Sequence, residues 1–482
     1  MTPVHRRAGR RRLVVLYRKT VRGAALVALL ALTVPACATD RGGSDAVPGN
    51  AAGDSATAAA EKFGTLDSPC GEGDAKGATD KGVTDTEIRI GYGDDRGFSQ
   101  SPGLNKEMGD AVEALVAWCN EQGGINGRKV VGNLHDAAMT QANTAMQDAC
   151  RSDFMLVGHG FAYDGAAEQT RIACKLPMVP GFTVSPHVAN APMSYQAMPF
   201  PADYVNTGIW HNAVKLYPEL KKGLAVVNHT SPALVSANAK SVEGWKSAGV
   251  KPLDCGVTLN YAGESSYVPF AEKYKSCGAD GLWNSRSATP SQFNLLQAVD
   301  QVGLDPVLFF EATWYTDAVA KWNTAGLADK LHVGMQYQPF ENASEVPAVK
   351  AYTDLVTAEG GKTSLLGMQA ASSFLLWATA AEQCGSELTR QCVVDKLSAV
   401  HEWTGGGLHA ATDPGANLPS ECVVVLRLTK NTWKQTRPAE AGEFDCDDSY
   451  LFRLSKKNWG TELNKDRIST EFLTDDVIEP QA

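Results

Sequence analysis

The hydrophobic positions of this 482-residue chain follow two spacings that alternate along the sequence. Compact apolar runs, typical of buried strands, are followed by segments in which apolar residues recur every three or four positions, as in amphipathic helices. In the first part of the chain the predicted strands are 87–92, 129–134, 154–157 and 178–179, and the predicted helices between them are 108–119, 140–150 and 164–175. Strands that alternate with helices predict a parallel, doubly wound sheet.

The same alternation begins again after Tyr204. The predicted strands are then 224–227, 253–259, 281–283 and 307–310, and the predicted helices are 235–248, 267–277 and 291–302. A crossing strand at 332–337, helices at 346–359, 368–384 and 390–399, and strands at 422–428 and 432–437 complete the pattern. Because 482 residues exceed what one hydrophobic core usually serves, we expect an α/β protein of two lobes, each with a doubly wound parallel sheet.

The stretch Phe154–Pro186 indicates where a binding site would lie. It contains a strand, a polar loop that begins at Gly158, a helical segment, a second strand and a second polar loop with Thr183 and Ser185. Both loops would leave the carboxyl ends of parallel strands, which is where open α/β sheets bind ligands. We therefore expect ligand contacts from both loops.

The N-terminus has the features of an export signal, because a basic region precedes a short apolar run at Ala24–Ala36. This run is shorter than the roughly 20 residues that a membrane-spanning helix needs. It ends at Val34-Pro35-Ala36-Cys37, which resembles the bacterial lipobox and predicts a lipid on Cys37 after removal of residues 1–36; ordinary cleavage nearby is the alternative. Residues 37–81, rich in small and polar side chains, are expected to tether the protein flexibly to the outer face of the cell membrane. The export route, general or twin-arginine, stays open.

Charge and motif content exclude several classes of function. Removal of residues 1–36 takes the formal net charge from −10 to −18, since that segment carries eight basic and no acidic side chains. This charge disfavours nucleic acid as a partner. The sequence has no G-x-S-x-G motif and no histidine or cysteine spacing typical of a metal site, so we expect no enzyme activity, no metal and no cofactor.

The ten cysteines that remain beside Cys37 are an even number in an exported chain, which favours disulfides. Closeness in sequence predicts the pairs Cys255 with Cys277, Cys384 with Cys392, and Cys422 with Cys446. Helices 140–150 and 164–175 would lie on one face of the sheet, so that Cys150 can meet Cys174 and Cys119 is left for Cys70. A pairing of Cys119 with Cys150 remains an alternative.

Three local sequences carry a resemblance to a known family. They are Asn120–Val130 (NEQGGINGRKV), Leu176-Pro177-Met178 before the fourth strand, and Gln301–Leu304 (QVGL) before a strand that ends near Glu311. On these, and on the order of its elements, the chain resembles the type I periplasmic binding proteins over about residues 84–438. Within them it resembles the leucine/isoleucine/valine-binding branch, which serves ABC importers of branched-chain amino acids.

The resemblance implies two lobes that are joined by three crossings and close on a ligand like a hinge. Lobe one would comprise residues 82–203 and 340–404, lobe two residues 204–339 and 405–442, with a tail at 443–482. The implied function is that of an exported, monomeric solute-binding lipoprotein, which captures an amino acid or related small organic molecule for the permease of an ABC importer. The alternatives are a ligand-binding sensor that signals to a membrane partner and a lipid-anchored hydrolase, and the ligand itself stays open.

The resemblance also implies site residues. Relatives that bind amino acids hold the carboxylate with amides and hydroxyls of two lobe-one loops, which correspond here to Ala162–Asp164 and Thr183–Ser185. Phe161-Ala162-Tyr163 departs from the serine or threonine that is common at the first loop. Glu311 falls where relatives hold an ammonium group in lobe two, with an ion pair to a nearby arginine as the alternative.

Residue chemistry adds further candidates. Asp94 and Asp95 follow the first strand, where they would hold a cation or hydroxyl groups, unless they lie in a solvated loop. His159 and Gly160 follow another glycine, so the backbone could approach a ligand closely, unless His159 is a neutral histidine within a turn. Aromatic residues just beyond strand ends predict an aromatic-lined cleft, with core packing as the alternative: Phe161, Tyr163, Trp283, Trp314 and Tyr315.

Overall fold

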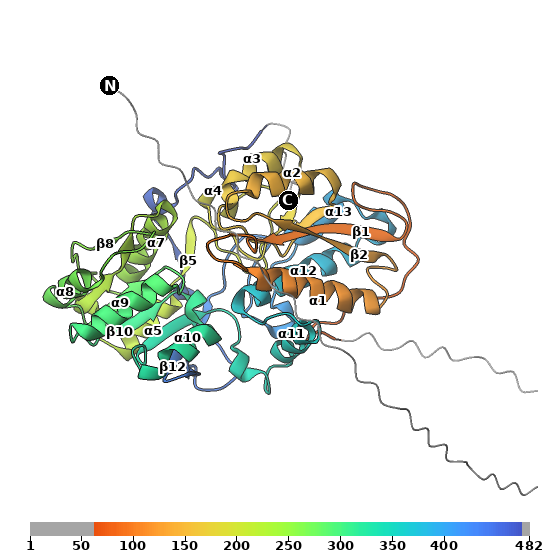
Figure 1. Cartoon of the computed structure of the whole chain (residues 1–482). Coiled ribbons are helices and arrows are strands. Elements are labelled where there is room, and N and C mark those ends of the chain that lie inside the picture. Colours follow the sequence, from red (N-terminus) through yellow and green to blue (C-terminus); the bar gives the residue numbers. More distant parts are fainter. Residues whose placement is uncertain (1–61, 475–482) are drawn as a thin grey trace, which may run out of the picture. The chain divides into compact units, whose positions relative to one another are not determined.

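The computed structural model describes residues 62–474, so the predicted export signal, Cys37 and most of the predicted tether lie outside the described residues. Its first sheet is parallel throughout, with the strand order β2-β1-β3-β4. Figure 1 shows β1 and β2 side by side. The strands are β1 (Glu87–Asp94), β2 (Lys129–Asp136), β3 (Met155–Val157) and β4 (Met178–Val179). The accompanying helices are α1 (Lys106–Glu121), α2 (Ala142–Ser152), α3 (Glu168–Ala173), α4 (Pro186–Ala189), α11 (Pro347–Ala358), α12 (Leu365–Glu382) and α13 (Arg390–Ser398). We call this group of elements lobe one.

Two helices from distant parts of the sequence form the core of lobe one. Helix α1 is amphipathic and buries Met108, Val112 and Leu115 on one face. Helix α12 is apolar around almost its whole circumference, and nearly all of its residues are buried, as is typical of a helix that packs on several sides. It contacts α1, α13, β3 and β4. The chain therefore returns to lobe one after building part of the second sheet.

The second sheet has the strand order β13-β12-β11-β10-β9-β6. Its parallel strands are β6 (Leu224–Val226), β9 (Gly281–Asn284), β10 (Val307–Phe310) and β11 (Leu331–Met335). Strands β12 (Cys422–Thr429) and β13 (Thr432–Arg437) are antiparallel and are joined by a turn in which Lys430 has a φ of 55°. The second sheet is therefore mixed, and the expectation of a parallel sheet holds for β6, β9, β10 and β11.

The remaining elements around the second sheet form lobe two with it. The helices are α5 (Gly208–Leu216), α6 (Leu220–Gly223), α7 (Pro232–Ser247), α8 (Val268–Ser276), α9 (Pro290–Gln301) and α10 (Asp317–Trp322), and a short parallel pair is formed by β7 (Asn228–His229) and β8 (Thr258–Leu259). Three indole rings pack on one another in its core: Trp210 and Trp245 have ring centroids 5.6 Å and 5.8 Å from that of Trp283. Among residues 62–474 no helix is long and apolar enough to cross a membrane.

Residues 62–81, which were expected to belong to a flexible tether, are packed onto lobe one. Phe63 has no exposed surface and its ring centroid lies 6.1 Å from that of Trp118 in α1. The buried Arg128 side chain donates hydrogen bonds to the carbonyl oxygens of Thr84 and Gly77. Within the described residues, the folded part of the chain therefore includes Phe63 and does not begin near residue 82.

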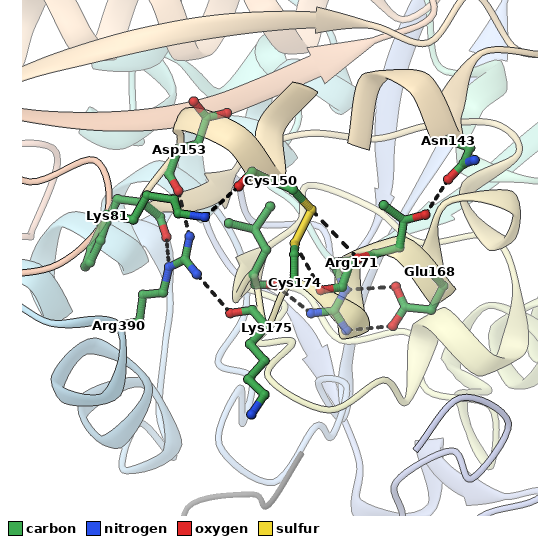
Figure 2. Close-up of a disulfide and its surroundings, with 12 residues drawn as sticks. Lys81, Asn143, Cys150, Asp153, Glu168, Arg171, Cys174, Lys175 and Arg390 are labelled. Atoms are coloured by element: carbon green, nitrogen blue, oxygen red, sulfur yellow. Dashed lines mark hydrogen bonds and ion pairs between the residues drawn. A yellow bond between two sulfur atoms is a disulfide. The ribbon is translucent and has the colours of Figure 1, made fainter. Parts of the chain in front are cut away.

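Among residues 62–474, five disulfides join the cysteines that we expected to pair. They are Cys70–Cys119, Cys150–Cys174, Cys255–Cys277, Cys384–Cys392 and Cys422–Cys446. Figure 2 shows that Cys150–Cys174 joins α2 to the end of α3. Arg390 of α13 lies beside it and donates to the carbonyl oxygens of Asp153, Phe154 and Lys175, so helices on this side of the sheet are linked both covalently and by hydrogen bonds.

The tail forms two short strands and a segment that contacts both lobes. Strand β14 (Asp445–Cys446) pairs with β12, and β15 (Leu451–Arg453) pairs with β5 (Tyr204–Asn206). Residues 454–471, which we call the strap, follow. In lobe two, the Ser455 N–H donates to the Glu243 carboxylate of α7 at 2.7 Å. In lobe one, the Ser469 N–H donates to the carbonyl oxygen of Asn190 at 2.8 Å.

Candidate functional site

Strands β1 and β3 lie side by side in the middle of the lobe-one sheet, and the chain continues from them toward opposite edges of that sheet. Such a switch point is where open α/β sheets bind ligands, beyond the carboxyl ends of the strands. Asp94 is the last residue of β1, Asp95 begins the loop after it, and the loop after β3 contains His159 to Asp164. The predicted site residues of lobe one therefore share one edge of its sheet.

Asp95 links three loops at this edge. Its buried carboxylate accepts the N–H of Met139, which follows β2, at 2.7 Å, and the N–H of Ala162, which follows β3, at 2.8 Å. Burial raises the pKa of Asp95, while the two backbone hydrogen bonds oppose that effect. The carboxylate therefore binds the protein's own amides, and its role is to position the loops rather than to lie in a solvated loop.

Asp164 makes the corresponding link between the loops after β3 and β4. Its carboxylate oxygens accept the N–H of Val184 at 2.7 Å and the N–H of Ser185 at 3.0 Å. Burial raises the pKa of Asp164 to about 6, although these hydrogen bonds act in the opposite direction. The amides expected to receive a ligand carboxylate thus already hold a carboxylate of the chain. Thr183, the residue before them, donates its hydroxyl to Gln196 at 3.0 Å.

Asp94 and His159 are buried beside this site. Asp94 forms an ion pair with Arg96 at 2.7 Å and also accepts the Arg96 N–H. His159 is 5% exposed and its Nδ1 atom has no hydrogen-bond partner among the described residues. Burial lowers the pKa of His159 to about 3, so the ring is neutral at pH 7. A Cβ atom on Gly160 would lie 2.3 Å from the Phe182 ring, so only glycine fits at that position.

Four of the five predicted aromatic residues pack in the cores rather than lining a cleft. Phe161, Trp283, Trp314 and Tyr315 are each 5% exposed or less. Trp283 belongs to the indole cluster of lobe two, and the Tyr315 ring stacks on Phe340 at 5.7 Å. Only Tyr163 among the five is exposed, at 51%, and it remains a candidate contact. These four rings pack in the cores because they lie at the ends of strands whose sheets are covered on both faces.

The lobe-two edge contains Glu311 and a residue that the sequence did not single out. Glu311 follows β10 and accepts the N–H of Thr313 at 2.9 Å, and burial raises its pKa. Among the described residues it forms no ion pair, so the arginine partner that was the alternative reading of Glu311 is not seen in this structure. Arg286, two residues beyond β9, is 9% exposed and stacks on the ring of Tyr261. An arginine just beyond a strand end, with no acidic residue near it in sequence, is the signal that could have identified it.

Exposed apolar side chains follow the carboxyl ends of strands in both lobes. Of the six large exposed hydrophobic residues described, Tyr163 and Val184 lie in lobe-one loops after β3 and β4. In lobe two, Val235 in α7 and Tyr261 after β8 follow the separate two-stranded sheet of β7 and β8. No group of three or more histidine, cysteine, aspartate or glutamate residues in the described part of the chain is arranged to bind a metal ion. These edges are therefore suited to an organic ligand with apolar surface.

Comparisons with known proteins agree on the fold. A family model described as periplasmic binding protein matches residues 87–432, whereas no curated protein matches by sequence. A fatty acid ABC transporter substrate-binding protein from Thermomonospora curvata is 14% identical, with a TM-score of 0.61 over 79% of this chain and 97% of that one. A leucine-binding protein from Thermotoga maritima is 14% identical, with a TM-score of 0.58 over 72% of this chain and 97% of its own. A putative branched-chain amino acid ABC transporter protein from Rhodospirillum rubrum is 13% identical, with a TM-score of 0.54 over 73% of this chain and 100% of that one.

Proposed function

This chain belongs to the periplasmic binding protein family, and from that premise we propose that it captures a small organic ligand, an amino acid or a related molecule, for the permease of an ABC importer. The ligand would bind between the carboxyl edges of the two sheets. Loops of both lobes would contact it, and the closed form would be populated because the ligand binds it more tightly than the open form. The family binds solutes outside the cytoplasm and carries out no reaction on them.

The observation that carries this proposal is the presence of exposed apolar side chains beyond the carboxyl ends of strands in both lobes. Tyr163 and Val184 in lobe one, and Val235 and Tyr261 in lobe two, are each at least 40% exposed. Apolar side chains left in water at a strand-end edge are stabilised when a ligand covers them. Asp95 and Asp164 support the site by fixing the loops that carry Tyr163 and Val184. We keep Thr183, Ser185 and Glu311 as further proposed contacts.

The hydrolase alternative would need an accessible nucleophile next to a base. Ser372 and His409 form such a contact, with Oγ and Nε2 2.7 Å apart, but both side chains are at most 1% exposed. Trp403 donates its indole N–H to Ser372, and His409 Nδ1 lies 2.8 Å from the Ala410 carbonyl oxygen. The pair therefore links two buried segments of the chain, and no substrate can reach it.

Ligand binding is tested by thermal denaturation of the mature protein with amino acids, amides, and aliphatic and aromatic acids. One class of compound should raise the melting temperature in a saturable way, with one site per chain. Tyr163→Ala should weaken binding by roughly five- to tenfold, because it removes an aromatic contact. Leu134→Ala, which removes an exposed side chain from the edge strand β2, is the control. Turnover of any compound by the pure protein, or no stabilising compound in the set, would refute the proposal.

We also propose that the mature protein is a monomer anchored by a lipid on Cys37. Cys37→Ser should move the protein from the membrane fraction to the soluble fraction, and mass spectrometry of the wild-type N-terminus should detect a diacylglyceryl group. The sensor alternative predicts a signalling kinase, rather than permease and ATPase subunits, among the neighbouring genes. Equal membrane association of the wild type and Cys37→Ser would exclude this anchor.

A further inference from the structure

Arg286 lies at the carboxyl edge of the lobe-two sheet, and its main chain is held on both sides. Its N–H donates to the side-chain oxygen of Asn284, the last residue of β9, at 3.0 Å. Its carbonyl oxygen accepts the indole N–H of Trp314 at 2.7 Å, and Trp314 has no exposed surface. The backbone that carries the Arg286 side chain is therefore well fixed.

The guanidinium group of Arg286 is buried without an acceptor. The side chain is 9% exposed, and Nε and Nη1 have no hydrogen-bond partner within residues 62–474. Its contact is with Tyr261, whose ring centroid lies 4.3 Å from the guanidinium carbon. A buried arginine normally donates most of its N–H groups, usually to an acidic partner. These donors are therefore available to an acceptor that does not belong to the chain.

The groups around Arg286 are neutral. Burial lowers the pKa of Arg286, and the ionisable groups that act on it are the phenols of Tyr261 and Tyr267 rather than any carboxylate. Burial also lowers the pKa of His229 to about 4, and the charge of Arg286 acts in the same direction, so this imidazole is uncharged at pH 7. Glu311, the carboxylate at the same edge, accepts the N–H of Thr313 and is not among the groups that act on Arg286. The guanidinium is therefore a buried cation without an acidic partner, and an anion would be attracted to it.

Lobe one presents the opposite situation at its own edge. Asp95 accepts the amide N–H of Ala162, and Asp164 accepts those of Val184 and Ser185. Two carboxylates already occupy the backbone donors that could bind an anion there. In lobe one a negatively charged group would therefore meet two acidic side chains and backbone N–H groups that already donate hydrogen bonds. In lobe two it would meet one acidic side chain, Glu311, and the unpaired N–H groups of Arg286.

We propose that Arg286 binds a carboxylate group of the ligand, so that lobe two, rather than lobe one, recognises the anionic end. A planar guanidinium can donate two parallel hydrogen bonds to the two oxygens of a planar carboxylate, and its one positive charge balances the one negative charge of that group. Tyr261, which is 42% exposed, offers a ring face to the adjoining apolar part of the ligand. The inference rests on the proposed function for the presence of a ligand, and it assigns that ligand to the carboxylic acids.

The test uses the mature protein and four probes: acetate with acetamide, and benzoate with benzamide, at constant ionic strength. Acetate or benzoate should raise the melting temperature of the wild type saturably, whereas the uncharged amides should not. Arg286→Gln should lose about ten- to a hundredfold in affinity for the carboxylate, because a charge-assisted pair is removed. Arg286→Lys keeps the positive charge but lacks the planar guanidinium. Its affinity for the carboxylate should therefore lie between those of the wild type and Arg286→Gln. Arg89→Gln removes an exposed arginine of β1 and is the matched control.

Three results would overturn the inference: equal stabilisation by each acid and its amide, equal responses of Arg286→Gln and the wild type, or no stabilisation of the wild type by either carboxylate. The proposed function fails separately, when no compound of the wider set binds the wild type. A ligand that the wild type and Arg286→Gln bind equally would refute the role of Arg286 and leave the binding function intact.

Discussion

Replacement of Asp164 by asparagine should change how the stability of the protein depends on pH. The Asp164 carboxyl is buried, and burial raises its pKa to about 6 from the ordinary value of 3.8. Burial is the largest cause of this higher pKa, and the hydrogen bonds from Ser185, Val184 and Gly165 act in the opposite direction. The folded state therefore binds this proton more tightly than the unfolded state does.

The sign and the size of the effect follow from that difference. Below pH 4 the carboxyl is protonated in both states and no penalty applies, whereas above pH 6 the folded state holds a buried negative charge. A difference of about two pKa units corresponds to about 3 kcal/mol of stability, lost between about pH 4 and pH 6. Asparagine does not titrate, but its amide can accept from only one of the two N–H groups, which costs about 1 kcal/mol at every pH. Asp164→Asn should thus be about 1 kcal/mol less stable than the wild type at pH 4 and about 2 kcal/mol more stable at pH 7.5.

The assay is urea denaturation, followed by tryptophan fluorescence, of both proteins between pH 4 and pH 8. All other titrating groups are shared, so they cancel in the difference between the two unfolding free energies. Asp354→Asn, which removes an exposed carboxyl from α11, controls for the loss of one negative charge. A difference between Asp164→Asn and the wild type that stays constant to within about 0.5 kcal/mol over this range would refute the assigned burial of the charge.

Three further perturbations test the packing. Trp245→Ala should lower the free energy of unfolding by about 3–5 kcal/mol in urea titrations, because a fully buried indole leaves a cavity; a loss below about 1 kcal/mol would contradict its place in the core. Replacing Cys70 and Cys119 together by serine should lower the free energy of unfolding by about 4 kcal/mol, because it opens a loop with a sequence separation of 49. It should also speed trypsin cleavage within residues 62–81. Unchanged cleavage would argue that this disulfide does not hold residues 62–81 on lobe one. Glu243→Ala should release the strap and increase its proteolysis, as mapped by mass spectrometry, whereas Glu272→Ala on the exposed face of α8 should not.

The sequence predicted the long, strongly periodic elements well and the interrupted ones poorly. Helix α1 and strand β2 were expected close to their observed bounds, because their apolar residues keep one period throughout. The strand expected at 253–259 is reduced to β8 (Thr258–Leu259), since Gly256 has a φ of 60° that breaks an extended chain. Helix α5 was missed because it is short and begins soon after the chain enters lobe two.

At the candidate site the sequence predicted position better than role. Asp95 and Asp164 were placed correctly at strand ends, but their hydrogen bonds to Ala162 and Val184 depend on which loops the fold brings together. Residues 95 and 162 are 67 positions apart in sequence, and no local pattern reports such a contact. The isolation of Arg286 is likewise a property of burial, since the sequence shows the arginine but not the missing partner.

The strap affects how this protein could be built into a biosensor. Glu243 of α7 holds it at Ser455, and Asn190 holds it at Ser469, so the last part of the folded chain is attached to both lobes. A fluorescent protein or an immobilising surface joined directly after the strap would pull on the hydrogen bonds that attach the strap to the two lobes. Any hinge motion between the lobes would have to stretch or break the same hydrogen bonds. A dye on the strap itself, at the exposed Lys457, should instead report that motion as a change in emission. The exposed turn at Lys430 and Asn431 is the better place for attachment, because it lies in a hairpin of lobe two alone.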